Sequence, residues 1–187
     1  SALQALARKL SGVLVIDEAY VDFSSENAID FAQRFENVLV TRSFSKSYGL
    51  AGMRIGFAAG NASLIEALLK VKDSYNVDRL AQVAALAAFQ DTAYLRSTVD
   101  RVRKTRKKLT GGLRKLGWEV LDSEANFVFG KPPRPAGEVM AALRRAKILV
   151  RHFPGPRTGE SLRISVGTDR EIELLLRALG RTSGGTV

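Results

Sequence analysis

The sequence predicts an α/β fold in which a mostly parallel sheet with helices, over residues 1–85, is followed by a smaller α+β domain over residues 86–187. Two continuous apolar runs, at residues 13–16 and 38–41, each lead into polar side chains, which is typical of strands buried in a parallel sheet. Beyond Gly117, short strand-like and helical segments alternate, which indicates a second domain. The 187 residues are 45% hydrophobic, enough for one sizeable core or two modest ones.

The first half of the chain is expected to contribute three strands to one sheet. Residues 13–16 (VLVI) form the apolar run that a strand buried on both faces requires, residues 38–41 repeat the pattern, and residues 55–59 are expected to form a third short strand. After these strands, Ser63 and Glu66 have the spacing of a capping box. A helix is therefore expected to begin near residue 63, because apolar side chains follow at helical spacing.

The second half is expected to begin with a long helical region, from about Asp78 to Leu116. Shorter elements follow it: strands at residues 118–121, 126–129, 148–151 and 162–166, and helices at residues 136–146 and 169–179. The last residues, 182–187, are expected to fray.

Composition excludes several kinds of site. The chain has no cysteine and only one histidine, His152, so disulfides, thiolate metal sites and histidine clusters are excluded, and no metal is expected. The longest apolar run, at residues 81–89, is interrupted by Gln82 and is far shorter than the roughly 20 residues that a membrane span needs. Residues 1–10 lack the basic-then-apolar order of a secretory leader. We therefore expect a cytoplasmic protein with no membrane partner.

The formal net charge of +10 allows three kinds of partner: nucleic acid, an anionic membrane surface or acidic small molecules. Eight basic residues of the long helical region carry much of this excess: Arg101, Arg103, Lys104, Arg106, Lys107, Lys108, Arg114 and Lys115. Apolar residues accompany them at near-helical spacing, so a solvated helix face explains them. No aromatic residue interleaves with them, as base stacking would need. No nucleic acid is expected as a partner, and a basic nucleic-acid-binding module stays as an alternative.

Chemically reactive side chains follow two of the predicted strands. Ligands of open α/β sheets bind outside the carboxyl ends of the strands, and two such ends carry Asp17 with Tyr20, and Ser43 with Lys46. A cofactor that acts as an electron sink needs a lysine to hold it, a carboxylate for its ring nitrogen and donors for its phosphate. Lys46, Asp17 and Arg54 are the candidates for these roles.

Each of these three residues also has an ordinary structural explanation. Asp17 can cap the turn after its strand, and Lys46 can be a solvated loop lysine. Arg54 can form a structural ion pair. Taken singly, the residues leave both explanations open.

Residues 43–56 (SFSKSYGLAGMRIG) resemble the lysine segment of the fold-type I pyridoxal-phosphate (PLP) aminotransferases. The serine three residues before the lysine and the arginine eight residues after it are both in place. The resemblance implies that Lys46 binds PLP covalently and shuttles the proton. It also implies that Ser43 and Arg54 hold the cofactor phosphate, with Ser45 as a further candidate.

Residues 17–20 (DEAY) are similar to the Asp-x-Ala-Tyr motif of the same family. In that motif the aspartate pairs with the pyridine nitrogen and the tyrosine donates to the phenolic oxygen of the cofactor. The resemblance implies these roles for Asp17 and Tyr20. The charge pair at Asp17 is expected to be buried, in surroundings of low dielectric.

The substrate-binding residues implied by the resemblance lie in the second half. The segment that contains Arg163 (residues 162–167, LRISVG) is similar to the family segment whose arginine binds the substrate carboxylate. Three segments look like the histidinol-phosphate aminotransferase branch: residues 148–151 (ILVR), 123–127 (SEANF) and 75–77 (YNV). In that branch the arginine at the Arg151 position helps to bind the substrate phosphate, and Asn126 would lie near Arg163. Arg151 could equally form an interdomain ion pair.

The resemblance implies a ping-pong transamination between L-histidinol phosphate or imidazole acetol phosphate and glutamate or 2-oxoglutarate, in histidine biosynthesis. The expected partners are a small-molecule amino donor and keto acceptor, and a second copy of the chain in a homodimer. Aromatic amino-acid aminotransferases and a threonine-phosphate decarboxylase share much of this pattern and remain alternatives.

The resemblance assigns this chain to the C-terminal portion of the family. Residues 1–85 would be the C-terminal part of the PLP-binding large domain, and residues 86–187 the small C-terminal domain. Further cofactor contacts of the family precede the Asp17 strand, so a catalytically inactive portion of the same fold is a further alternative.

Overall fold

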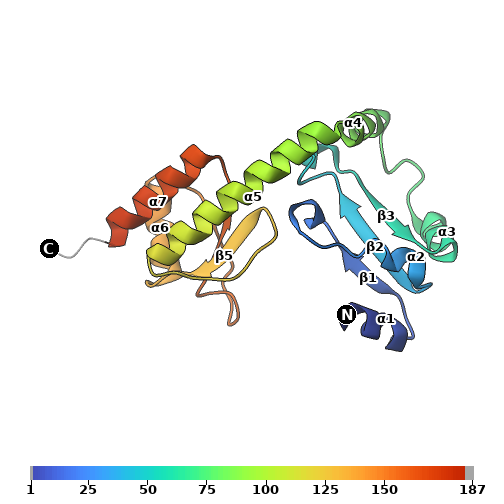
Figure 1. Ribbon diagram of the computed structural model, residues 1–187, viewed down its shortest axis with the longest axis horizontal. Coiled ribbons are helices and arrows are strands. Elements are labelled where there is room, and N and C mark those ends of the chain that lie inside the picture. Colours follow the sequence, from blue (N-terminus) through green and yellow to red (C-terminus); the bar gives the residue numbers. More distant parts are fainter. Residues whose placement is uncertain (1, 184–187) are drawn as a thin grey trace. The chain divides into compact units, whose positions relative to one another are not determined.

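The computed structural model describes residues 2–183 and divides them into two compact units, one up to Thr98 and one from Val99 (Figure 1). Residues 184–187, part of the segment expected to fray, lie outside the described residues, whereas Thr182 and Ser183 belong to the last helix. The division falls inside a long helix. The domain boundary expected after residue 85 stays a prediction.

The first unit contains a three-stranded sheet of β1 (Leu14–Asp17), β2 (Val38–Ser43) and β3 (Gly56–Gly60), in that order. β1 and β2 are parallel, with Asp17 opposite Thr41, whereas β2 and β3 are antiparallel. The three expected strands are thus confirmed and share one sheet. The sheet is mixed rather than mostly parallel, because residues 44–55 return the chain along β2 instead of crossing over the sheet.

Helices and short helical turns complete the first unit. They are α1 (Ala2–Lys9), η1 (Val21–Phe23), α2 (Phe31–Arg34), η2 (Ala51–Met53), α3 (Ala62–Val71), α4 (Arg79–Gln90) and the start of α5 (Thr92–Lys115). Ala7 of α1 and Ala32 of α2 pack with Val38 and Val40 of β2 in one buried cluster. This packing places α1 and α2 on one face of the sheet.

The first strand is less buried than its apolar run predicts. Leu14 and Ile16 pack against the core, but Val15 is 55% exposed and Asp17 is exposed as well. The prediction of a strand buried on both faces is therefore wrong for the described residues. The physical reason is that β1 is an edge strand, and residues 2–183 leave the face that carries Val15 open.

The start of α3 also differs from the prediction. Asn61 is its N-cap, and the Asn61 side-chain oxygen accepts a hydrogen bond from the Ser63 N–H at 3.0 Å. The capping box at Ser63 and Glu66 is therefore wrong, because Ser63 already lies inside the first turn. Asparagine is as favourable an N-cap as serine, so the chain can begin the helix earlier.

The long helical region expected from Asp78 to Leu116 is confirmed, with a break at Asp91 between α4 and α5. Asp78 caps α4 by accepting a hydrogen bond from the Ala81 N–H, and Asp91 accepts one from the Tyr94 N–H at the start of α5. An aspartate at each start satisfies backbone donors that the helix itself leaves unpaired.

The second unit contains a four-stranded antiparallel sheet in the order β4-β5-β7-β6. Its strands are β4 (Glu119–Val120), β5 (Phe127–Lys131), β6 (Arg151–His152) and β7 (Leu162–Ser165), and its further helices are α6 (Ala136–Arg145) and α7 (Asp169–Ser183). Val128, Leu162 and Ile164 face a core that α5, α6 and α7 complete.

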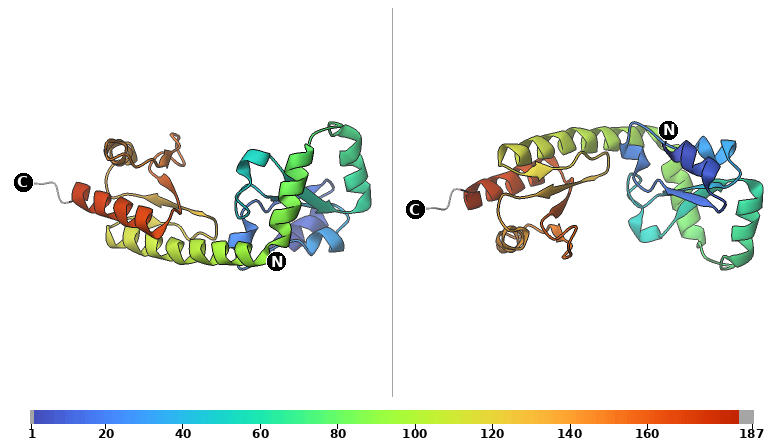
Figure 2. Two further views of the ribbon diagram at one scale, coloured as in Figure 1. Left: turned by 90° about the horizontal axis from the view of Figure 1, so that it is seen from above. Right: turned by 90° about the horizontal axis from the view of Figure 1, so that it is seen from below.

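Helices α5 and α7 lie side by side in this unit (Figure 2). Gly112 of α5 permits the close approach, because a Cβ there would lie 2.4 Å from Cδ1 of Leu176 in α7. α7 begins with a capping box that the sequence analysis missed: the Glu171 carboxylate accepts from the N–H and hydroxyl of Thr168. Both hydrogen bonds lower the pKa of Glu171, and the one from the Thr168 N–H has the larger effect.

Some of the basic residues of α5 bind groups within the second unit. Arg106 donates to the Ala125 carbonyl at 2.7 Å, and Arg114 pairs with Asp122 at 2.9 Å. Other basic residues of the helix, such as Lys104 and Lys107, are exposed. Within residues 2–183 no helix has the length and apolar character needed to cross a membrane.

The strand expected at residues 148–151 is observed as the shorter β6, Arg151–His152. It begins later in the chain because Ile148 takes part in the hydrogen bonds that end α6. The Ile148 N–H donates to the Leu143 carbonyl at 2.9 Å and the Lys147 N–H to the Arg144 carbonyl at 3.0 Å, which together form a Schellman motif. This motif places Lys147 at a φ of 59°, in the left-handed region that glycine prefers.

We expect Lys147→Gly to stabilise the second unit by about 1 kcal/mol, because glycine adopts a positive φ without the strain caused by a Cβ. Urea unfolding followed by Trp118 fluorescence measures the change, since Trp118 is the only tryptophan and is buried in this core. Lys147→Ala is the control, because it removes the same charge but keeps the Cβ. Equal midpoints for the two variants would contradict the explanation.

Candidate active site

The carboxyl ends of β1 and β2 lie at one edge of the first sheet. Their parallel register places Asp17, the last residue of β1, opposite Thr41, and β2 continues to Ser43. The Glu18 N–H extends the ladder by donating to the Thr41 carbonyl at 2.8 Å. The two segments that carry the candidate cofactor residues therefore begin beside each other, as the sequence predicts.

The candidate lysine lies in the loop of residues 44–55, which joins β2 to β3. The loop is closed at its base by the Phe44 N–H, which donates to the Ile55 carbonyl at 3.1 Å. Inside it, the Gly49 N–H donates to the Lys46 carbonyl at 3.2 Å, and Gly49 has a φ of 70°. The Lys46 Nζ lies 5.3 Å from the ring centroid of Tyr20. Two predicted site residues that are far apart in sequence are thus brought together.

Three candidate phosphate-binding residues form a second group: Ser43 at the end of β2, and Ser45 and Arg54 in the loop. The Ser45 N–H donates to the Ser43 hydroxyl at 3.0 Å. Arg54 has a left-handed backbone, with a φ of 52°, and its exposed guanidinium donates to the Ser45 hydroxyl at 3.5 Å and to the Ala51 carbonyl at 2.9 Å. Among residues 2–183, Arg54 forms no ion pair. The structural ion pair considered for it is therefore wrong for the described residues.

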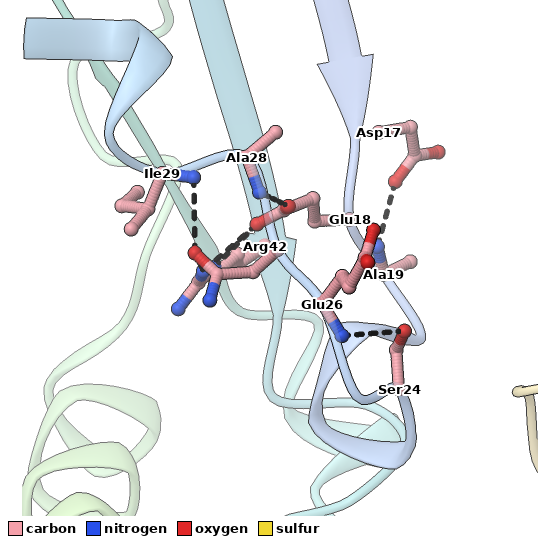
Figure 3. Close-up of polar contacts among 9 residues, drawn as sticks. Asp17, Glu18, Ala19, Ser24, Glu26, Ala28, Ile29 and Arg42 are labelled. Carbon is pink, nitrogen blue, oxygen red and sulfur yellow. Dashed lines mark hydrogen bonds and ion pairs between the residues drawn. The ribbon is translucent and has the colours of Figure 1, made fainter. Parts of the chain in front are cut away.

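Asp17 caps the turn that follows β1, as one of its two explanations required. Its Oδ1 accepts a hydrogen bond from the Ala19 N–H at 2.9 Å (Figure 3). The expected burial of this carboxylate is wrong for the described residues, because Asp17 ends an edge strand and is exposed. Its second oxygen leaves it able to accept a donor from a ligand as well.

The acidic residue that is buried at this edge is Glu18, which the sequence analysis missed. Figure 3 shows its carboxylate directed at Arg42 of β2 and at the Ala28 backbone. The Glu18 Oε2 lies 2.8 Å from the Arg42 Nη2 and 2.9 Å from its Nε, and the Oε1 accepts from the Ala28 N–H. The Glu18 side chain is only 7% exposed, so this pair fastens the end of β1 to β2 and to the following loop.

A second buried contact fastens the lysine loop to the segment of Tyr20. Ser47, which is 3% exposed, donates from its hydroxyl to the Asp22 carboxylate in η1. Beside it, Tyr48 packs on Phe44 with ring centroids 4.7 Å apart. Burial, followed by the nearby charge of Asp22, raises the pKa of Tyr48. Lys46 therefore lies in the sequence between two buried residues, Phe44 and Ser47.

The substrate-binding candidates Arg151 and Arg163 are brought together in the second unit. They lie directly opposite each other on the paired strands β6 and β7. The Arg163 guanidinium carbon is 4.6 Å from the Phe127 ring centroid, and that of Arg151 is 5.4 Å from the Phe153 ring centroid. Asn126 directly precedes β5, and its carbonyl accepts from the Val166 N–H at 2.8 Å.

Comparison with known proteins assigns the chain to a family. The family model for aminotransferase class I and II matches residues 1–179. The chain belongs to this aminotransferase family. Within residues 2–183, no group of three or more histidine, aspartate, glutamate or cysteine side chains could hold a metal ion.

Two histidinol-phosphate aminotransferases are related to this chain over most of its length. The protein of Gluconacetobacter diazotrophicus is 54% identical over 172 residues, 90% of this chain and 48% of the relative. That of Geobacter sp. (strain M21) is 49% identical over 181 residues, 96% of this chain and 52% of the relative. The chain thus spans about half the length of these family members.

The fold is found in a solved family member. The crystal structure of histidinol-phosphate aminotransferase from Sinorhizobium meliloti in complex with pyridoxal-5'-phosphate matches with a TM-score of 0.86 and 29% identity, over 97% of this chain and 52% of that chain. This match confirms the predicted α/β fold class for the aminotransferase chain.

We expect Glu18→Ala to destabilise the edge of the first sheet by about 3 kcal/mol, because it leaves Arg42 without its buried partner. Amide hydrogen exchange, read by mass spectrometry over residues 24–30 and β2, measures the loss as faster exchange. Glu26→Ala is the matched control, because Glu26 is exposed and its substitution removes the same charge. Equal acceleration in both variants would show that net charge, not the Glu18–Arg42 pair, controls this edge.

Proposed function

We propose that the protein is a PLP-dependent histidinol-phosphate aminotransferase, which transfers an amino group between L-histidinol phosphate and 2-oxoglutarate. The observation that carries the proposal is the position of Lys46 beside Tyr20 and next to the Ser43, Ser45 and Arg54 group. Support for the substrate comes from relatives of that name at 49% and 54% identity. Because the chain spans about half of them, the activity is proposed for the whole protein.

The residues of the first unit fit PLP by their chemistry. Lys46 supplies a primary amine for covalent attachment, and the two serine hydroxyls with the Arg54 guanidinium supply neutral and charged donors for a phosphate. The Asp17 carboxylate, at the end of the neighbouring strand, would keep a proton on the ring nitrogen. Tyr20, against which Lys46 lies, would donate its hydroxyl to the phenolic oxygen.

The proposed mechanism gives Lys46 two tasks. When bound, PLP supplies an electron sink for the electron pair that remains on the substrate carbon after deprotonation. The Lys46 Nζ would hold the cofactor covalently, and as a free amine it would accept and return a proton at the substrate carbon. Phe44 and Ser47, which flank this lysine in the sequence, are buried and anchor the backbone on either side of it.

The residues of the second unit would bind the ends of the substrates. We assign the carboxylate of glutamate to Arg163, with Asn126 near it, and the phosphate of histidinol phosphate to Arg151. A guanidinium suits both anions, because its N–H groups match two oxygens at once. A homodimer and a cytoplasmic location stay predictions.

Addition of PLP to the protein is expected to produce a visible absorption band, and borohydride reduction to leave an adduct on Lys46 that peptide mapping locates. Lys46→Ala should lose both signals. Lys70→Ala, which removes an exposed lysine at the end of α3, should retain them. Adducts spread over many lysines, or a band that survives in Lys46→Ala, would contradict the role of Lys46.

The same PLP-loaded protein distinguishes the substrates. L-histidinol phosphate is expected to change the band at least about tenfold faster than L-phenylalanine at equal concentration, because its phosphate can pair with Arg151, whereas the carboxylate of L-phenylalanine can pair with Arg163 but leaves Arg151 without a partner. The opposite order would instead indicate an aromatic amino-acid aminotransferase.

A further inference from the structure

Three arginines from three elements of the second unit line one hollow. Arg144 near the end of α6, Arg151 of β6 and Arg163 of β7 surround a volume of about 580 Å³. The other lining residues are Leu149, Val150, Phe153 and Ser165, none of them acidic. The hollow therefore combines a strong positive charge with a partly apolar wall.

The positive charges in this hollow are not compensated by the described residues. Arg151 and Arg163 are directly opposite each other across β6 and β7, where like charges destabilise the strand pair. Among residues 2–183, neither they nor Arg144 forms an ion pair. An anion bound between them would replace repulsion by attraction.

Local packing keeps the arginines available to such an anion. Phe127 and Phe153 lie against the guanidinium groups of Arg163 and Arg151, with contacts to the ring faces rather than to acceptor groups. The position of Arg144 follows from the helix end, because its carbonyl accepts the Lys147 N–H in the Schellman motif. Because the backbone is already fixed there, only the side-chain freedom of Arg144 is lost when it binds a ligand.

We propose that Arg144 is a specificity-determining residue, which binds the phosphate of a phosphate monoester together with Arg151 and Arg163. A phosphate monoester carries a charge of roughly −1.5 to −2 at neutral pH, whereas a carboxylate carries a single charge. A third cation therefore favours the phosphate ester over a carboxylate. The inference deepens the proposed function and rests on it for the nature of the substrate, but the hollow lies wholly in the second unit.

The test is a titration of the protein with inorganic phosphate at constant ionic strength, followed by amide and arginine side-chain NMR shifts. Arg144→Gln is expected to weaken phosphate binding about fivefold. Arg145→Gln, the matched control, removes the neighbouring charge of α6 from a residue that does not line the hollow, and should leave the affinity unchanged. O-phosphoethanolamine, a monoester that also carries an amine, should compete with phosphate.

Three results would overturn the inference: equal losses in Arg144→Gln and Arg145→Gln, which indicate general attraction; absence of phosphate binding to the unaltered protein; or failure of O-phosphoethanolamine to compete. The titration needs no PLP. A failure here together with a normal Lys46 adduct would therefore reject the role of Arg144 alone, whereas a normal titration without an adduct would reject the proposed cofactor chemistry.

Discussion

The parallel pairing of β1 with β2 is the constraint on which the candidate site depends. Because the strands run in the same direction, Asp17 and Ser43 leave the sheet at one edge, and the segments of Tyr20 and Lys46 follow them there. Val38 and Val40 stabilise this arrangement, because they are fully buried on the face of the sheet that α1 and α2 cover. An antiparallel pair would have sent the two polar ends to opposite edges. The return of the chain along β3 then closes the lysine loop at its base.

Charged residues have opposite roles at two places in the molecule, one in each unit. In the first unit the buried Glu18 carboxylate and Arg42 satisfy each other, so the pair positions the edge and offers little charge to a ligand. A buried pair of this kind contributes modestly to stability, because desolvation offsets much of the attraction. In the second unit Arg151 and Arg163 lie opposite each other, a repulsive contact that a purely structural sheet would avoid. Uncompensated charge, rather than total charge, is the reason for proposing that this surface binds anionic substrates.

Sequence patterns predicted the positions of the strands and helices better than the burial and the long-range contacts of individual residues. Apolar runs located β1 and β2, and the lysine segment correctly placed Ser43, Ser45 and Arg54 near one another, because these depend on local order. The exposure of Asp17 could not be predicted from local order, because the same apolar run can occur in an edge strand or in a central strand. Glu18 was missed because its partner Arg42 is 24 residues away and only strand register joins them. The opposition of Arg151 and Arg163 likewise depends on the pairing of β6 with β7.

The ends of β1 and β2 bring Lys46 and Tyr20 into one site before any ligand binds. This arrangement can be checked by nuclear Overhauser effects between the Lys46 ε-methylene protons and the Tyr20 ring protons, in selectively labelled protein without PLP. With the Lys46 Nζ at 5.3 Å from the Tyr20 ring centroid, clear cross-peaks are expected. Their absence, in a protein whose β1–β2 cross-peaks are intact, would show that the sheet does not assemble this site.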